Sequence, residues 1–272
     1  MSFTVGSTRR MLTRAAVLAA AAGLGAAALA GPASADVTIQ QYVALGDSFA
    51  SGVGAGDYLA DDGCYRSANA YPKAAEAALG ERLWFEACSG AKIEDVVANQ
   101  LGHLYRANTE HVTIGVGGND AGFSTVLGAC AGTDTALCEA AIANARAIIT
   151  DSLPAELDDL YTRVENRAFS AEIVVVGNPR LFAETACAGA LAITPAEQAL
   201  LNDAADLLAE TTAAVAADHG FDFADPRAAF DGHGVCSADP WILGYTGNLE
   251  SFHPNAAGQA AYADVVVPLL DY

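Results

Sequence analysis

Basic side chains are scarce in this chain of 272 residues. Its 13 lysines and arginines stand against 33 aspartates and glutamates, which gives a formal net charge of −20. Nucleic acids and anionic membrane surfaces attract proteins through positive charge, so this composition excludes both as partners. Aromatic residues make up only 8% of the chain. Together with the many alanines, this argues against a large exposed apolar lid.

Metal-ligand and nucleotide patterns are also missing. The chain has no Cys-x-x-Cys, and none of its five histidines pairs with another at ligand spacing, so we expect no metal site. The glycines of residues 52–56 do not fit the Gly-x-Gly-x-x-Gly loop of dinucleotide-binding proteins. Asp57 and Leu59 stand where the third glycine would have to be. We therefore expect no cofactor.

No apolar run after residue 35 is long enough to span a bilayer, so stable membrane anchoring is not expected. The first 35 residues instead predict a removable signal peptide. Arginines precede an apolar stretch at residues 15–30, and an Ala-Ser-Ala cleavage site follows. Adjacent Arg9 and Arg10 also fit a twin-arginine signal, so both export routes stay open. We expect a secreted, extracellular domain of residues 36–272.

Strand-like and helical stretches alternate along residues 36–272, with no repeat, low-complexity tract or linker between them. Strands are expected at residues 42–45, 83–87, 112–116, 173–176 and 221–223. Helices are expected at residues 71–79, 93–100, 138–165 with a break at Pro154, 195–218 and 255–270. This alternation predicts one α/β domain, a three-layer α/β/α sandwich around a five-stranded parallel sheet. In the flavodoxin-like strand order 2-1-3-4-5, the site lies at the carboxyl edge, between strands 1 and 3.

The most informative motif is Leu-Gly-Asp-Ser-Phe-Ala-Ser-Gly at residues 45–52. Ser48, set just past a strand end among small residues, can expose its hydroxyl in a cleft, although such a serine can equally cap a helix. A serine needs a base to become a nucleophile. His253, in Glu-Ser-Phe-His-Pro-Asn, is the candidate base, because the glycine-rich surroundings of His233 indicate a surface loop.

Two further motifs follow other predicted strands. Gly90 ends a Cys-Ser-Gly motif after the second strand, and Asn119 lies in Gly-Gly-Asn-Asp after the third. Alone, Gly90 is a plain turn residue and Asn119 a loop residue. The carboxyl ends of parallel strands meet at one edge, so Gly90 and Asn119 join Ser48 there, within reach of the His253 loop. This convergence favours a catalytic site.

The four blocks, in this order, resemble the SGNH/GDSL family of serine hydrolases. More closely, the chain resembles the secreted three-disulfide GDSL lipases and esterases of actinobacteria, over essentially all of residues 36–272. The resemblance implies that Ser48 attacks an ester carbonyl with His253 as its base, through an acyl-enzyme. It also implies an oxyanion hole made of the backbone N–H groups of Ser48 and Gly90 and the side-chain amide of Asn119.

The third catalytic group is less clear, because the family usually carries an aspartate three residues before the histidine. This chain has Glu250 at that position. A glutamate can orient the imidazole of His253 in the same way, but its longer side chain changes the geometry. Some relatives use a backbone carbonyl instead, and here the carbonyl of Ser251 is in the right place. Both alternatives stay open.

Six cysteines in an exported chain indicate disulfides, and the sequence alone allows 15 pairings. The resemblance implies that neighbours pair in order: Cys64 with Cys88, Cys130 with Cys138, and Cys187 with Cys236. A bond at Cys88 would pin the loop that carries Gly90.

The resemblance further implies that the substrates are carboxylic esters, with acyl lipids the leading expectation. A carbohydrate acetyl esterase or a phospholipase on the same fold is the alternative. A binding protein without turnover is disfavoured, because Ser48, His253 and Asn119 are all present. We expect a monomer whose only partner is its ester substrate.

Overall fold

The computed structural model describes residues 40–60, 62–105 and 107–270. They belong to one compact unit, Thr38–Tyr272. The predicted signal peptide, residues 1–35, lies outside the described residues. Along the described ranges, no helix is both long and apolar enough to cross a membrane.

The described residues form a five-stranded sheet in the order β2-β1-β3-β4-β5, which confirms the predicted order. The strands are β1 (Gln41–Gly46), β2 (Arg82–Phe85), β3 (Thr109–Gly115), β4 (Glu172–Val176) and β5 (Asp222–Ala224). Every neighbouring pair is parallel. Strand β1 is buried along its whole length. An apolar strand of this kind is typical of the centre of a sheet that is covered on both faces.

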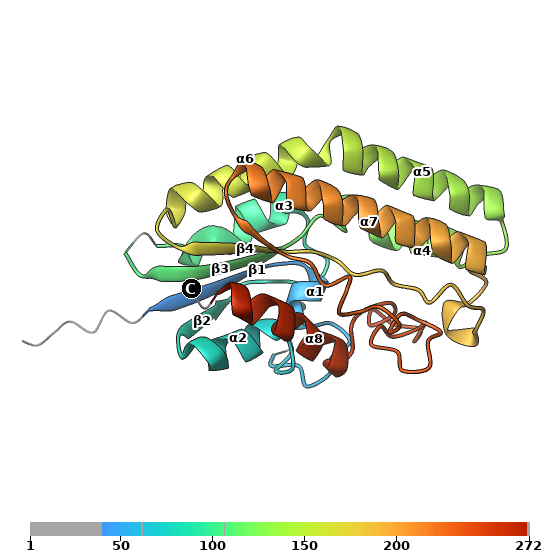
Figure 1. Cartoon of the computed structure of the whole chain (residues 1–272), viewed down its shortest axis with the longest axis horizontal. Helices are drawn as coiled ribbons and strands as arrows, with labels where there is room; N and C mark the ends of the chain where they lie inside the picture. Colours follow the sequence, from blue (N-terminus) through green and yellow to red (C-terminus); the bar gives the residue numbers. More distant parts are fainter. Residues whose placement is uncertain (1–39, 61, 106, 271–272) are drawn as a thin grey trace, which may run out of the picture. The chain divides into compact units, whose positions relative to one another are not determined.

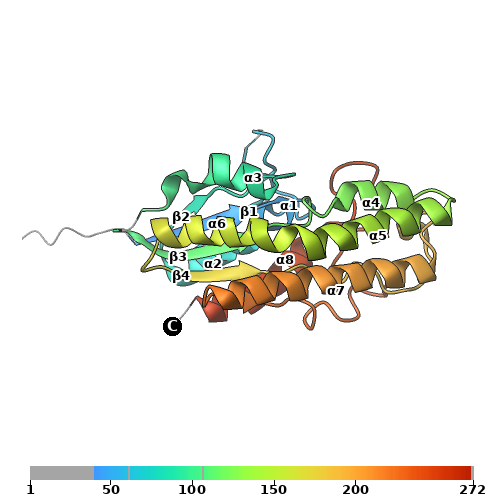
Figure 2. The ribbon, with the colours of Figure 1, turned by 90° about the horizontal axis from the view of Figure 1, so that it is seen from above.

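Helices cover both faces of this sheet, as Figures 1 and 2 show. The helices are α1 (Ser48–Ser51), α2 (Tyr71–Leu79), α3 (Ile93–Asp95), α4 (Phe123–Cys130), α5 (Thr135–Asp151), α6 (Leu153–Arg167), α7 (Pro195–Asp218) and α8 (Ala256–Val266). Short helical turns are η1 (Val96–Gln100), η2 (Leu101–His103), η3 (Ala188–Ala190) and η4 (Val267–Leu269). Helices α5 and α7 run side by side along one face.

Side chains of β1 alternate between two apolar clusters. Tyr42 and Ala44 join the cluster that contains the apolar residues of α2 and α8. Val43 and Leu45 join the cluster that contains those of α3 and α6. This period of two is what a strand between two helical layers requires, and it confirms the predicted three-layer sandwich.

Several helix boundaries differ from the prediction. The helix expected at residues 138–165 is two helices, and the break falls at Ser152 rather than at Pro154. Pro154 lies in the first turn of α6, where its missing N–H leaves no hydrogen bond unmade. The helix expected at residues 93–100 is one turn of α3 followed by a π-helix, η1. The last helix ends at Val266, before the turn η4.

Helix α4 was not predicted at all. It is short, contains Gly128 and follows a glycine, so its local helix preference is weak. Its last residue, Cys130, forms a disulfide with Cys138 in α5. Tertiary contacts with α5 therefore stabilise α4 where its own sequence does not.

The disulfide pairing implied by the resemblance is confirmed. The bonds join Cys64 to Cys88, Cys130 to Cys138, and Cys187 to Cys236. By restricting the unfolded chain, each such bond is typically worth about 2–4 kcal/mol of stability.

Candidate active site

The end of β1 places Ser48 at the carboxyl edge of the sheet. Gly46 has a φ of 140°, and a Cβ atom there would lie 2.2 Å from the carbonyl oxygen of Gly115, so only glycine fits. The chain then turns directly into α1, whose first residue is Ser48. Asp47 caps this helix, because its carboxylate accepts a hydrogen bond of 2.9 Å from the Phe49 N–H.

The structure brings Ser48 and His253 together, although 205 positions separate them in the chain. The distance between Ser48 Oγ and His253 Nε2 is 2.7 Å. Both residues are 7% exposed. The rings of Phe49 and Phe123 pack beside the imidazole, with centroids 5.1 and 5.8 Å from its own. The pair is therefore preformed and shielded from bulk water.

The protonation of His253 suits a general base. Its Nδ1 lies 2.9 Å from the carbonyl oxygen of Ser251, which can only accept, so Nδ1 carries the proton. Nε2 is then free to accept from the Ser48 hydroxyl. Burial lowers the pKa of His253 to about 4, although the hydrogen bond to Ser251 acts in the opposite direction. The imidazole is consequently neutral at neutral pH.

The structure does not bring the Glu250 carboxylate to Nδ1 of His253, where the carbonyl of Ser251 lies instead. Glu250 accepts a hydrogen bond of 2.6 Å from the Tyr58 hydroxyl. That hydroxyl in turn accepts from the Gly54 N–H at 3.1 Å. Burial and the bond to Glu250 raise the pKa of Tyr58 to about 12, so it remains a donor. Glu250 thus links the histidine loop to the glycine-rich loop after Ser48.

Of the three predicted oxyanion donors, Ser48 and Asn119 line the same pocket, whereas Gly90 does not. The Ser48 N–H begins α1 and so has no partner within the helix. The Asn119 amide donates at 3.0 Å to the carbonyl of Ala91, the residue after Gly90. Gly90, with a φ of 78°, lines a neighbouring hollow.

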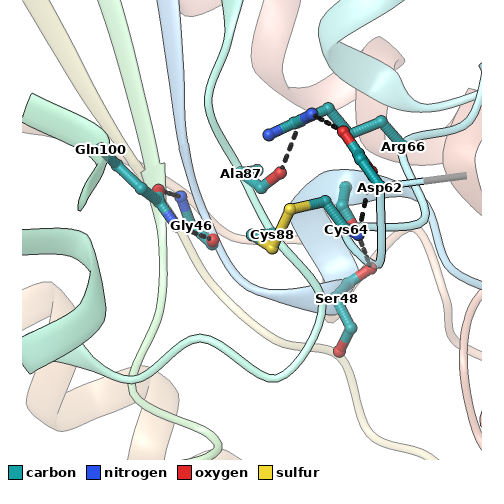
Figure 3. The surroundings of a disulfide bond; sticks show 9 residues. Gly46, Ser48, Asp62, Cys64, Arg66, Ala87, Cys88 and Gln100 are labelled. Carbon is teal, nitrogen blue, oxygen red and sulfur yellow. Dashed lines mark hydrogen bonds and ion pairs between the residues drawn. A yellow bond between two sulfur atoms is a disulfide. The ribbon is translucent and has the colours of Figure 1, made fainter. Parts of the chain in front are cut away.

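The loop that carries Gly90 is tied to the nucleophile turn by a hydrogen bond, and to the segment after that turn by a disulfide, which Figure 3 shows. The Cys88 N–H donates at 3.0 Å to the carbonyl of Gly46. The disulfide from Cys88 leads to Cys64, whose carbonyl accepts from the Ser89 N–H at 3.0 Å. The predicted pinning of this loop by a disulfide is therefore present.

An apolar pocket begins at Ser48 and Asn119. Its walls are apolar side chains of three helices: Phe123, Val126 and Leu127 of α4, Ala145 and Ile149 of α5, and Leu201, Ala204, Ala205 and Leu208 of α7. Sequence reasoning missed these residues, because apolar spacing looks the same for a pocket wall and for a core. Within the described ranges, no cluster of three or more His, Cys, Asp or Glu side chains could hold a metal ion.

Asp47 is a buried carboxyl group, and its ionisation destabilises the folded protein. Burial raises its pKa to about 7, although the hydrogen bond from Phe49 opposes this shift. The folded state therefore favours the protonated carboxyl. Its contribution to stability is full below the unfolded pKa near 4 and is lost as the pH rises through about 7.

We expect Asp47→Asn to stabilise the protein more at pH 8 than at pH 5, since asparagine caps helices equally well and cannot ionise. The difference should be roughly 2 kcal/mol, as measured by urea unfolding at the two pH values. Asp134→Asn, at the exposed N-cap of α5, controls for the change of capping atom. A stability change that is the same at both pH values would contradict a buried, titrating Asp47.

Comparison with known proteins identifies the family. The model of the GDSL-like Lipase/Acylhydrolase family matches residues 44–261. A lipase of Streptomyces rimosus is 42% identical over 256 residues, which covers 93% of this chain and 95% of that protein. Lipase 1 of Streptomyces coelicolor is 42% identical over 252 residues, which covers 90% and 91%.

Solved structures agree. The extracellular lipase of Streptomyces rimosus superimposes with a TM-score of 0.79 and covers 85% of this chain and 98% of its own. A phospholipase A1 of Streptomyces albidoflavus, 41% identical, gives the same TM-score and covers 86% and 98%. With the motifs, the disulfides and the sheet all in place, this chain belongs to the GDSL-like lipase/acylhydrolase family and is a carboxylic ester hydrolase.

Proposed function

We propose that the protein is a secreted lipase or carboxylesterase that cleaves acyl esters through a covalent intermediate on Ser48. The observation that supports this most is the 2.7 Å contact between Ser48 Oγ and the neutral His253 Nε2, at the mouth of an apolar pocket. This contact has the geometry that activation of a serine requires.

In the first half of the proposed reaction, Ser48 gives its proton to His253 Nε2 while its oxygen attacks the ester carbonyl carbon. The negative oxygen of the tetrahedral intermediate is stabilised by the N–H groups of Ser48 and Gly90 and by the Asn119 amide. When the intermediate collapses, His253 returns the proton to the leaving alcohol. The acyl group stays on Ser48.

In the second half, a water molecule gives a proton to His253 and attacks the acyl-enzyme. When the second intermediate collapses, the bond between Ser48 Oγ and the acyl carbon breaks, His253 returns its proton to Ser48 Oγ, and the free acid leaves. In both halves the carbonyl of Ser251 holds the Nδ1 proton, keeps the imidazole in the productive tautomer and favours its transient cation.

The apolar lining of the pocket, which extends from Ser48 along three helices, favours an acyl chain of several carbons over an acetyl group. A chain that enters between α4, α5 and α7 buries its methylenes, each worth about 0.8 kcal/mol. A phospholipid is the second candidate, because a relative of 41% identity is a phospholipase A1. Its acyl chain would occupy the same pocket.

We expect the protein to cleave p-nitrophenyl esters of eight or more carbons with a higher kcat/KM than the acetate. Ala204→Phe, which fills the pocket from α7, should lower kcat/KM for the long esters about tenfold and spare the acetate. Ala214→Phe, on the exposed side of α7, is the matched control. Cleavage of acetyl esters alone would instead support a carbohydrate acetyl esterase.

We further propose that the protein is exported, loses residues 1–35 and acts as a monomer. Three disulfides suit an oxidising extracellular environment. Removal of residues 1–35, by the twin-arginine or the general secretory route, leaves a chain that begins at Asp36. N-terminal sequencing of protein recovered from the medium should therefore start with Asp-Val-Thr. A chain that still starts at Met1 would contradict this.

A further inference from the structure

The last residue of β1, Gly46, needs hydrogen-bond partners that the sheet does not provide. On the β3 side, the next residue along the chain, Asp47, is hydrogen-bonded: its N–H donates at 2.9 Å to the carbonyl of Gly115. On the other side β2 has already ended, since its last residue, Phe85, pairs with Ala44. The N–H of Gly46 therefore has no partner in β2, whereas its carbonyl accepts from the Cys88 N–H beyond the end of that strand. Buried backbone groups rarely stay unpaired.

The side chain of Gln100 satisfies both groups (Figure 3). Its Oε1 accepts from the Gly46 N–H at 2.8 Å, and its Nε2 donates to the Gly46 carbonyl at 2.9 Å. The side-chain amide thus acts as a strand residue where β2 has none. Gln100 is 3% exposed, so these bonds are shielded from competing water.

An unusual local structure carries Gln100. It is the last residue of the π-helix η1, Val96–Gln100, between the single turn of α3 and the turn η2. π-Helical turns are rare and occur frequently at functional sites. One extra residue in a turn rotates the residues that follow by about 100° relative to an α-helix. In this chain, the residue at that point is the one whose amide faces Gly46.

The Gly46 carbonyl is a shared junction. It accepts from Gln100 Nε2 and also, at 3.0 Å, from the Cys88 N–H. Gly46 lies two residues before Ser48, and Cys88 lies two residues before Gly90. A single buried amide is therefore hydrogen-bonded to the point where the nucleophile turn and the predicted oxyanion loop meet.

We propose that Gln100 is a positioning residue that holds Ser48 and the Gly90 N–H in register for the tetrahedral intermediate. The inference rests on the proposed roles of those two residues. Gln100 touches no reacting atom and acts only through Gly46. Because it does not line the acyl pocket, its loss should change kcat rather than KM.

The first test is Gln100→Leu, which keeps the volume and removes both hydrogen bonds. We expect kcat for p-nitrophenyl butyrate to fall about a hundredfold, the typical result of a shift near 1 Å at reacting groups, with KM within about twofold. Circular dichroism and thermal unfolding verify that the variant is folded.

Gln198→Leu is a closely matched control. Gln198 is also fully buried, and its amide holds the N–H and the C=O of one residue, Thr185, at 3.1 and 3.2 Å. It lies on α7 and does not line the pocket of Ser48. We expect a comparable loss of stability and a kcat within about twofold of wild type.

Gln100→Glu is the second variant, and it decides the matter if Gln100→Leu does not fold. It keeps an acceptor for the Gly46 N–H, but only its protonated form can donate to the Gly46 carbonyl. We therefore expect the ratio of its kcat to that of wild type, both measured at the same pH, to rise at least about tenfold as the pH is lowered from 8 to 5. A purely structural role would leave this ratio flat.

The proposal is overturned if folded Gln100→Leu keeps kcat within about threefold of wild type, or if Gln198→Leu loses as much. If Gln100→Leu does not fold, the proposal is overturned when the kcat of Gln100→Glu, relative to wild type, is the same at pH 8 and pH 5. A failure of the proposed function would look different. If the proposed function is wrong, Ser48→Ala retains activity. If only the role of Gln100 is wrong, wild-type turnover still depends on Ser48.

Discussion

Ser48→Ala lowers kcat by a factor of at least about 10⁴ and leaves the protein folded, if Ser48 carries the acyl group. Alanine cannot form the acyl-enzyme, so only binding and the oxyanion donors remain to act on the ester. Ser48 is 7% exposed, and among the described residues its hydroxyl has a polar contact only with His253, so its removal leaves no buried group unpaired there except Nε2. Hydrolysis of p-nitrophenyl butyrate, followed with thermal unfolding, measures both effects.

Ser67→Ala is the control for this substitution. Ser67 is also buried, but its hydroxyl donates to the carbonyl of Gly56 rather than to the imidazole. It should keep wild-type turnover. A fluorophosphonate should label wild type and Ser67→Ala, but not Ser48→Ala. Turnover that survives in Ser48→Ala would refute the covalent mechanism.

His253→Ala should reduce kcat/KM by at least about 10³, whereas Glu250→Ala should reduce it less than about tenfold. The reason is that the Nδ1 proton is accepted by the backbone carbonyl of Ser251, 2.9 Å away, which no side-chain substitution removes. The Glu250 carboxylate is bonded to Tyr58 instead, and it influences the imidazole only through its charge and its loop. Kinetics of both variants at pH 8 give the comparison.

Tyr58→Phe separates the two possible roles of Glu250. If the carboxylate acts through Tyr58, then Tyr58→Phe, Glu250→Ala and the double variant should all show similar, small losses, because each breaks the same link. The opposite result would be a loss in Glu250→Ala as large as that in His253→Ala, with no effect of Tyr58→Phe. That outcome would make the Glu250 carboxylate the partner of the imidazole.

The sheet and the candidate catalytic side chains could be predicted because their signals are local. An apolar run such as that of β1 indicates a buried strand whatever surrounds it, and polar residues after successive parallel strands must share one edge. The start of α7 was equally clear. Thr194 and Glu197 form a capping box just where the helix was expected to begin, with the carboxylate accepting from the Thr194 N–H at 2.8 Å.

The helical segments that shape the site were not predictable in the same way. Helix α4 is stabilised by its disulfide to α5, and η1 departs from α-helical geometry inside a stretch that was predicted to be one ordinary helix. The pairing of the six cysteines came from the resemblance to a family, because spacing alone leaves all alternatives open. Non-local contacts outweigh local propensity in each of these cases.

The sequence by itself predicted the fold class, and with the flavodoxin-like pattern also the strand order. It marked Ser48, His253 and Asn119 as candidate catalytic residues, because side-chain chemistry at strand ends is a local property. Only the tertiary structure decided the group that faces Nδ1 of His253, the walls of the apolar pocket and the contact of Gln100 with Gly46. The first involves Phe252, which has a φ of 62° and lies in the chain between the Ser251 carbonyl and the His253 ring that this carbonyl contacts. A phenylalanine rarely adopts that conformation, so no pattern predicts it. All three depend on distances between groups that only the packed chain specifies.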